Sequence, residues 1–171
     1  MVILQRRKKN RVKDYDYSQS GAYFITICVK DKREMLCKIP VGANCVRPVL
    51  LEYGQIAERE IAVLSETYSA IDVACHIIMP NHIHMINVIN NEEQTGGRTQ
   101  FAPTNSRVIK QFKGSISKKI GFSIWQKSFH DHIIRNEEDY TRIYDYIENN
   151  PITWEQDCHF VSHESNVSDH T

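Results

Sequence analysis

The sequence lacks three features that would narrow its function at once: a net charge, a paired-cysteine pattern and a long apolar run. Its 21 Lys and Arg residues balance 21 Asp and Glu residues, so the total charge does not indicate a polyanionic partner. The five cysteines are scattered without a C-x-x-C pair, which argues against zinc and redox motifs and fits reduced thiols. No apolar run approaches the roughly 20 residues of a membrane span. We therefore expect a cytoplasmic protein with no membrane partner.

At 171 residues the chain is long enough for one domain with its own core. We expect a single domain over residues 1–171, with three segments at its periphery. These are a basic N-terminal tail (1–13), a polar flexible loop (90–104) and a C-terminal tail (155–171).

The hydrophobic pattern predicts an α+β fold. Runs rich in β-branched and aromatic residues are typical of strands, and apolar residues at helical spacing indicate helices. We expect 35–39 to pair with 21–30 as a hairpin, and 70–79 to pair with 82–89 across the turn at Pro80-Asn81. The element order favours an antiparallel sheet with helices packed on one face. The predicted strands are 21–30, 35–39, 70–79, 82–89 and 123–135, and the predicted helices are 49–65, about 107–120 and 136–149.

Two histidines, His82 and His84, lie one residue apart in a strand-like run. Because side chains alternate along a strand, both point to one face while Ile83 points to the other. Two neutral imidazoles can bind one divalent metal, but a catalytic site usually needs a third protein ligand. By itself the pair is as consistent with surface histidines as with a metal site.

Tyr146 and Asn150 lie four residues apart on the last predicted helix, so they project from the same side. A phenol can act as a nucleophile, and an amide oxygen can bind a metal beside two imidazoles. Tyr140 and Tyr144 are rival nucleophiles on another side of this helix. The residue pattern alone does not decide between them.

His130 and His132 form a second H-x-H, with Asp131 rather than an apolar residue in the middle. They could line a DNA groove or support the active site, and a structural or surface role is at least as well supported.

The chain resembles the REP-associated tyrosine transposases, which belong to the single-tyrosine HUH superfamily, over roughly residues 14–151. The matching stretches are "DYDYSQSGAYFITICVKDK" (14–32), "IIMPNHIH" (77–84), "IKQFKGSISKK" (109–119), "WQKSFHDHIIRNEEDY" (125–140) and "YIENNP" (146–151).

The resemblance implies a fold, a site and an activity. It implies a ferredoxin-like or RRM-like sandwich, with His82 and His84 as metal ligands and catalytic residues, Tyr146 as the nucleophile and Asn150 as a further metal ligand, although Asn149 is adjacent. With Mg²⁺ or Mn²⁺, similar proteins cut and rejoin single-stranded DNA at hairpin-forming palindromic elements through a 5′-phosphotyrosine. Relatives include monomers and dimers, so the resemblance does not decide whether this chain forms a homodimer. We expect association with the bacterial nucleoid.

Basic side chains gather in two segments that could follow a DNA backbone, although such runs are often simply solvated. Given the resemblance, we expect both to bind DNA: Arg6, Arg7, Lys8 and Lys9 in the tail, and Arg107, Lys110, Lys113, Lys118 and Lys119 on the helix.

Three other functions compete with this interpretation. A replication or mobilisation nickase would use the same chemistry on a different DNA target. A non-catalytic nucleic-acid-binding module would explain the basic helix but not the tyrosine and the H-x-H pair. A histidine-triad hydrolase would need a third histidine where the chain has Ile86.

Overall fold

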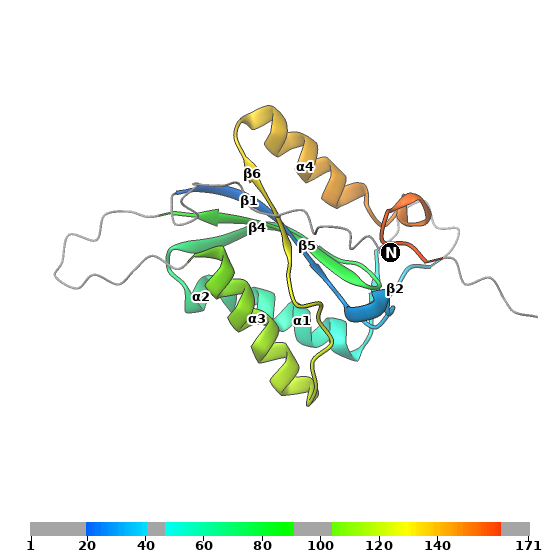
Figure 1. Cartoon of the computed structure of the whole chain (residues 1–171). Helices are drawn as coiled ribbons and strands as arrows, with labels where there is room; N and C mark the ends of the chain where they lie inside the picture. Colours follow the sequence, from blue (N-terminus) through cyan, green and yellow to red (C-terminus); the bar gives the residue numbers. More distant parts are fainter. Residues whose placement is uncertain (1–19, 41–46, 91–103, 162–171) are drawn as a thin grey trace, which may run out of the picture.

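The structure is a computed structural model that describes residues 20–40, 47–90 and 104–161. Its centre is a four-stranded antiparallel sheet with the strand order β4-β5-β1-β6 (Figure 1). β1 and β5 are therefore the central strands, and β4 and β6 are the edges. The four strands are β1 Gly21–Cys28, β4 Ile71–Ile78, β5 His82–Ile89 and β6 His130–Ile134.

Helices and short elements complete the described chain. β2 Cys37–Lys38 and β3 Val49–Leu50 pair with each other. The α-helices are α1 Glu52–Ala62, α2 Leu64–Thr67, α3 Asn105–Ile120 and α4 Glu137–Asn149, and the 3-10 turns are η1 Lys30–Lys32 and η2 Trp154–Gln156. Among the residues described, none of the helices combines the length and the apolar composition that a membrane crossing needs.

The α+β class with an antiparallel sheet is confirmed, but the helices lie on both faces of the sheet (Figure 1). On β5, Ile83 and Met85 face the larger core, which α1 and α3 cover. Ile86 points the other way and packs with Ile143 and Ile147 of α4. This differs from the expectation that all helices cover one face. The two core clusters arise because alternate residues of β5 are apolar on both sides.

Two strand predictions were wrong. Residues 35–39 do not pair with β1, because β5 and β6 occupy both edges of β1; instead β2 pairs with β3. The strand predicted over 123–135 is regular only in β6. Ahead of β6, the ammonium group of Lys113 donates hydrogen bonds to the carbonyl oxygens of Gln126 and Ser128 at 2.5 and 3.3 Å. These carbonyls therefore do not take part in a regular strand ladder.

The helix predicted over 49–65 is divided into β3, α1 and α2. The prediction for α4 is confirmed at both ends. Asn136 is the N-cap, and its Oδ1 accepts a hydrogen bond from the backbone N of Asp139 at 2.8 Å. The helix ends at Asn149, two residues before Pro151.

Part of the predicted C-terminal tail is ordered against the sheet. Asn81 Nδ2 donates to the carbonyl of His159 at 2.8 Å, and Lys32 Nζ donates to the carbonyl of Cys158 at 3.0 Å. These bonds satisfy backbone groups that a tail would leave to water. The expectation of a tail thus fails for 155–161. The basic tail (1–13), most of the loop (91–103) and residues 162–171 lie outside the described residues.

Two glycines give a test of how closely α1 approaches its neighbours. A Cβ at Gly54 would lie 2.0 Å from the backbone oxygen of Leu36, whereas a Cβ at Gly114 on α3 would meet nothing within 4 Å. We expect Gly54→Ala to lower the free energy of unfolding by at least about 2 kcal/mol, because backbone must move. Gly114→Ala should raise it by about 0.5 to 1 kcal/mol. Urea denaturation measures both, and an unchanged Gly54→Ala protein would contradict the close approach.

Candidate active site

His82 and His84 lie side by side on the face of the sheet that α4 covers. Both are buried, with 0% and 2% of their surface exposed. Their Nε2 atoms are 3.0 Å apart. The sequence therefore predicted correctly that the two imidazoles share one face, but not that both would be withdrawn from water.

The protonation state of His82 follows from its neighbour Asn81. The side-chain amide of Asn81 donates from Nδ2 to the carbonyls of Lys32 and His159, at 3.2 and 2.8 Å. Its Oδ1 therefore faces His82 Nδ1 at 2.9 Å, so Nδ1 carries the proton and donates it. The Nε2 atom of neutral His82 is then left with a lone pair, as a metal ligand requires.

The hydroxyl of Thr26 on β1 holds His84 in a similar way. Thr26 Oγ1 lies 2.9 Å from His84 Nδ1, and the two residues are direct partners in the ladder between β1 and β5. The ring of Phe24, two residues earlier on the same face of β1, lies 5.1 Å from the His84 ring. Each histidine is thus oriented through Nδ1 and presents Nε2 to the space between them.

α4 brings Tyr146 to this pair. The Tyr146 hydroxyl lies 3.3 Å from His84 Nε2, although the two residues are 62 positions apart in the sequence. The Tyr146 ring packs edge-on against Phe24 at 6.1 Å, and 39% of the residue remains exposed. The tyrosine is therefore fixed by its ring and open to a ligand at the same time.

Asp157 is a site residue that the sequence analysis missed. Its Oδ2 accepts hydrogen bonds from the Tyr146 hydroxyl at 3.0 Å and from Asn150 Nδ2 at 2.9 Å. Its Oδ1 accepts from the backbone N of His159 at 2.7 Å. Asp157 lies just beyond η2, in the segment expected to be a tail. No spacing rule connects it to the histidines, and only the chain path after α4 places it there.

Burial and charge set the protonation of the cluster. Burial lowers the pKa of His84 to about 3 and lowers the pKa of His82 well below its ordinary value. Burial, together with the negative charge of Asp157, raises the pKa of Tyr146. Burial by itself would raise the pKa of Asp157. Hydrogen bonds to its carboxylate, of which that from Asn150 has the largest effect, lower the pKa to about 2. At neutral pH the site thus holds two neutral imidazoles, one carboxylate and a protonated phenol.

These shifts predict a loss of stability in mild acid. The unfolded chain binds protons at its histidines below about pH 6.5, while the folded chain keeps His84 neutral, so stability is complete above that pH and falls below it. Between about pH 5 and about pH 6.5 we expect the free energy of unfolding of chelator-treated protein to fall by roughly 1.4 kcal/mol per pH unit for each buried histidine. Urea denaturation at several pH values measures the slope. His84→Gln should reduce it, and a flat profile in the unsubstituted protein would contradict the burial.

The donor atoms of the cluster fit a divalent metal. The ligand atoms of His82, His84 and Asp157 all lie within 4.8 Å of one another. The two Nε2 atoms are 3.0 Å apart, so both could bind the same ion. Within the described part of the chain, the buried Oδ1 of Asn150 has no hydrogen-bond partner. The set could therefore hold Mg²⁺ or Mn²⁺, with Asn150 beside it.

The structure does not bring the basic residues of α3 to this site, because α3 covers the opposite face of the sheet. Arg107, Lys110 and Lys118 are exposed there. Lys119 forms an ion pair with Glu60, and Lys113 is half-buried against the carbonyls before β6. The basic residues predicted in the N-terminal tail, Arg6, Arg7, Lys8 and Lys9, lie outside the described residues.

His130 and His132 lie on the same face of the sheet as the buried pair. His130 is the ladder partner of Thr26, which itself is the partner of His84. Both residues of the second pair are exposed, on the edge strand β6. Neither belongs to the group of possible metal ligands around His82 and His84.

The residues on which the alternative interpretations depend do not lie at this site. Tyr140 and Tyr144 stack on each other at 6.3 Å between ring centres. Tyr140 packs against the small core under α4. Ile86, which occupies the position where a histidine triad needs its third histidine, is fully buried in that core. Of the three tyrosines, Tyr146 is therefore the one that lies beside the histidine pair, and the geometry offers no support for a histidine triad.

Comparison with known proteins gives relatives over most of the chain. No family model matches it. An uncharacterized protein of Haemophilus influenzae is 31% identical over 177 residues, which cover 92% of this chain and 95% of the relative. The REP-associated tyrosine transposase of Escherichia coli is 25% identical over 136 residues, covering 80% of this chain and 69% of the relative.

A solved structure has the same fold. It is that of the REP-associated tyrosine transposase bound to a REP hairpin, and it matches with a TM-score of 0.59 and 22% sequence identity. The match covers 79% of this chain and 68% of the solved one.

Proposed function

Because the chain belongs to the family of the REP-associated tyrosine transposases and is a DNA-cleaving and DNA-joining transposase, we propose that it acts on single-stranded DNA at hairpin-forming palindromic elements. One observation carries the proposal. The hydroxyl of Tyr146 lies 3.3 Å from Nε2 of His84 and 3.0 Å from the carboxylate of Asp157, so a nucleophile and a set of metal-binding donors meet at one point.

The proposed reaction is a transesterification. The Tyr146 oxygen attacks the scissile phosphorus, the bond from phosphorus to the 3′-oxygen breaks, and that oxygen takes up a proton to become a 3′-hydroxyl. The DNA is then held as a 5′-phosphotyrosine. Attack by another 3′-hydroxyl reverses the step and joins the strands. Because the phosphodiester energy is kept in the covalent link, the reaction needs no ATP.

His82, His84 and Asp157 would hold a divalent metal, with Asn150 Oδ1 as a further donor. When bound, the metal supplies positive charge that polarises the scissile phosphate and favours the phenolate. Asn81 and Thr26 keep the two imidazoles in the orientation that this requires. We propose Asn150 rather than Asn149 as this donor, because the side-chain amide of Asn149 donates a hydrogen bond to the carbonyl of Asp145.

Asp157 has a second role in the proposal. The phenol of Tyr146 is protonated in the resting protein, and its hydroxyl points its proton at Asp157 Oδ2. This keeps the oxygen lone pairs of Tyr146 turned away from the carboxylate. The proton must leave as the oxygen attacks, and Asp157 Oδ2, which already accepts the hydrogen bond of this hydroxyl at 3.0 Å, is the acceptor that we propose.

The DNA partner is proposed by analogy with the related transposase that binds a REP hairpin. The exposed residues Arg107, Lys110 and Lys118 of α3 lie on the face away from the tyrosine, so they suit the part of the DNA that lies furthest from the cleavage point.

The test is a covalent-adduct assay. The full chain is incubated with single-stranded DNA that carries a hairpin and an unpaired flank, with Mn²⁺ or with chelator, and analysed on a denaturing gel. We expect a protein–DNA adduct that requires metal, and a joined product when a second strand with a free 3′-hydroxyl is added. Equal cleavage of unstructured strands without joining would favour a nickase. Binding without any adduct would favour a non-catalytic module.

A further inference from the structure

We propose that Arg142 binds the backbone phosphate next to the scissile one, and that Asp139 and His132 hold Arg142 in position to do so. This inference rests on the proposed function, since it assumes that Tyr146 attacks a phosphate of a single DNA strand. It assigns a role to a cluster at the beginning of α4 that the reaction itself does not use.

The first argument is the placement of Arg142 along α4. Arg142 lies four residues before Tyr146, which is about one turn or roughly 6 Å along the axis, and on the same side of the helix. Asp139 lies seven residues before Tyr146, two turns away on nearly the same side. One stripe of α4 therefore carries Asp139, Arg142, Tyr146 and Asn150 in that order, above the sheet face that holds the two buried histidines.

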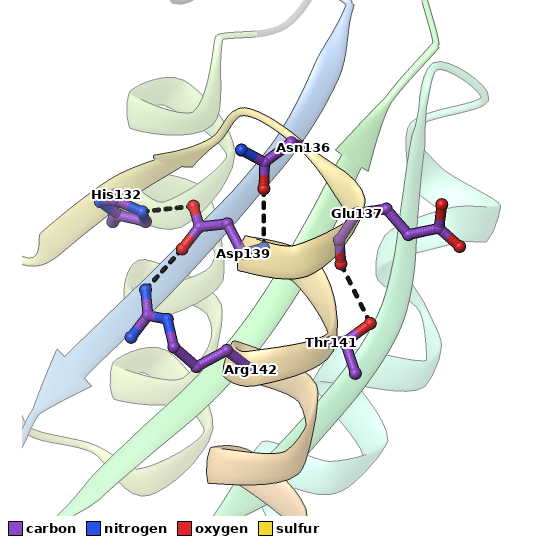
Figure 2. Close-up of polar contacts among 6 residues, drawn as sticks. All are labelled: His132, Asn136, Glu137, Asp139, Thr141 and Arg142. Carbon is purple, nitrogen blue, oxygen red and sulfur yellow. Dashed lines mark hydrogen bonds and ion pairs between the residues drawn. The ribbon is translucent and has the colours of Figure 1, made fainter.

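The second argument is that Arg142 is held from the sheet. Figure 2 shows Asp139 between two partners: its Oδ1 receives the guanidinium of Arg142 at 2.5 Å, and its Oδ2 lies 2.8 Å from Nε2 of His132 on β6. The backbone N of Asp139 is itself bound to the Asn136 side chain. The arginine is thus held by a residue whose carboxylate contacts β6 and whose backbone is bound to the N-cap of α4, and this lowers the entropy lost on binding a ligand.

The third argument is the capacity of Arg142 for an anion. Its side chain is 70% exposed, and a guanidinium has five N–H donors in a planar fork that fits a phosphate. The hydrogen bond to Asp139 uses one NH2 group. By contrast, Lys113 directs its ammonium group to backbone carbonyls and Lys119 is paired with Glu60. Arg142 therefore places an exposed positive charge one turn from the nucleophile.

A purely structural role makes a different prediction. An exposed Arg–Asp pair at i and i+3 stabilises a helix only slightly and has no effect on DNA binding. If that were the whole role of Arg142, its removal would lower the melting temperature slightly and leave DNA binding unchanged.

The test compares Arg142→Gln with Arg59→Gln. Arg59 is an exposed arginine of α1, on the opposite face of the sheet, and its Nε also donates within its own helix. Binding to a hairpin with a single-stranded flank is measured by fluorescence anisotropy at several salt concentrations, with chelator to prevent cleavage. For Arg142→Gln we expect Kd to rise about tenfold and the salt slope to fall by about one, because one phosphate contact is lost. Arg59→Gln should match the unsubstituted protein.

Two more measurements make the role specific. Arg142→Lys keeps the positive charge but not the planar guanidinium, so its Kd should lie between those of the unsubstituted protein and Arg142→Gln. A hairpin without the flank should bind Arg142→Gln and the unsubstituted protein equally. Unchanged binding of the flanked hairpin by Arg142→Gln would overturn the inference, and so would equal weakening for the hairpin alone.

The outcomes separate this inference from the proposed function. If the unsubstituted protein forms a metal-dependent adduct while Arg142→Gln binds the flanked hairpin normally, only the role of Arg142 is wrong. If the unsubstituted protein forms no adduct, the proposed function is wrong, and the role of Arg142 in that reaction is wrong with it.

Discussion

Replacing Tyr146 with phenylalanine is expected to abolish the covalent protein–DNA adduct, with a fall in rate of more than about a thousandfold. The substitution removes only the hydroxyl, which lies 3.3 Å from His84 Nε2 and donates to Asp157. The ring keeps its edge-on contact with Phe24. DNA binding and thermal stability should therefore change little, and the loss would be one of chemistry.

Tyr144→Phe is the matched control for this experiment. Tyr144 lies on the same helix and is also 39% exposed, but it stacks on Tyr140 rather than on the histidine pair. We expect it to form the adduct at the normal rate. An adduct that persists in Tyr146→Phe, or one that is lost in Tyr144→Phe alone, would assign the nucleophile to another residue.

Replacing His82 with glutamine is expected to lower the affinity for Mn²⁺ by at least about tenfold and the rate of adduct formation by at least about a hundredfold. His82 Nε2 is one of three donors that lie within 4.8 Å of one another, and its lone pair is fixed by Asn81. The affinity can be read from the rise in melting temperature on adding Mn²⁺, because a ligand of the folded state stabilises it by mass action.

His76→Gln is the control for the metal experiment. His76 lies on the neighbouring strand β4 and bonds Glu58 at its Nε2, away from the candidate metal ligands. Its substitution should leave the Mn²⁺ response and the adduct unchanged. If His82→Gln shows the full rise in melting temperature with Mn²⁺, the metal lies elsewhere and the proposed role of the histidine pair is wrong.

The parts of the fold that the sequence predicted are those decided by local patterns. The pairing of β4 with β5 follows from two apolar runs joined by Pro80-Asn81, and α4 begins at a capping asparagine and ends near a proline. The shared face of His82 and His84 follows from the strand period alone.

The remaining features depend on contacts between distant segments. The burial of His84 depends on Thr26 of another strand and on Tyr146 of a helix, which no local pattern encodes. Asp157 reaches the site only because the chain after α4 turns back over the sheet. Lys113 looked like part of a basic surface, yet its ammonium group lies under the segment before β6. Spacing within one element could not reveal any of these arrangements.

Two contacts of α4 indicate how many copies of the chain the reaction needs. Asp139 contacts His132 near the beginning of the helix, and Tyr146 contacts His84 further along it, so a single polypeptide brings the tyrosine to the histidines in this structure. One chain thus assembles a full set of reacting groups. Cleavage would then be first order in protein, and two copies that exchanged this helix would each have to break the contacts of Asp139 with His132 and of Tyr146 with His84. If the chain does form a homodimer, the second copy is not needed to bring these groups together.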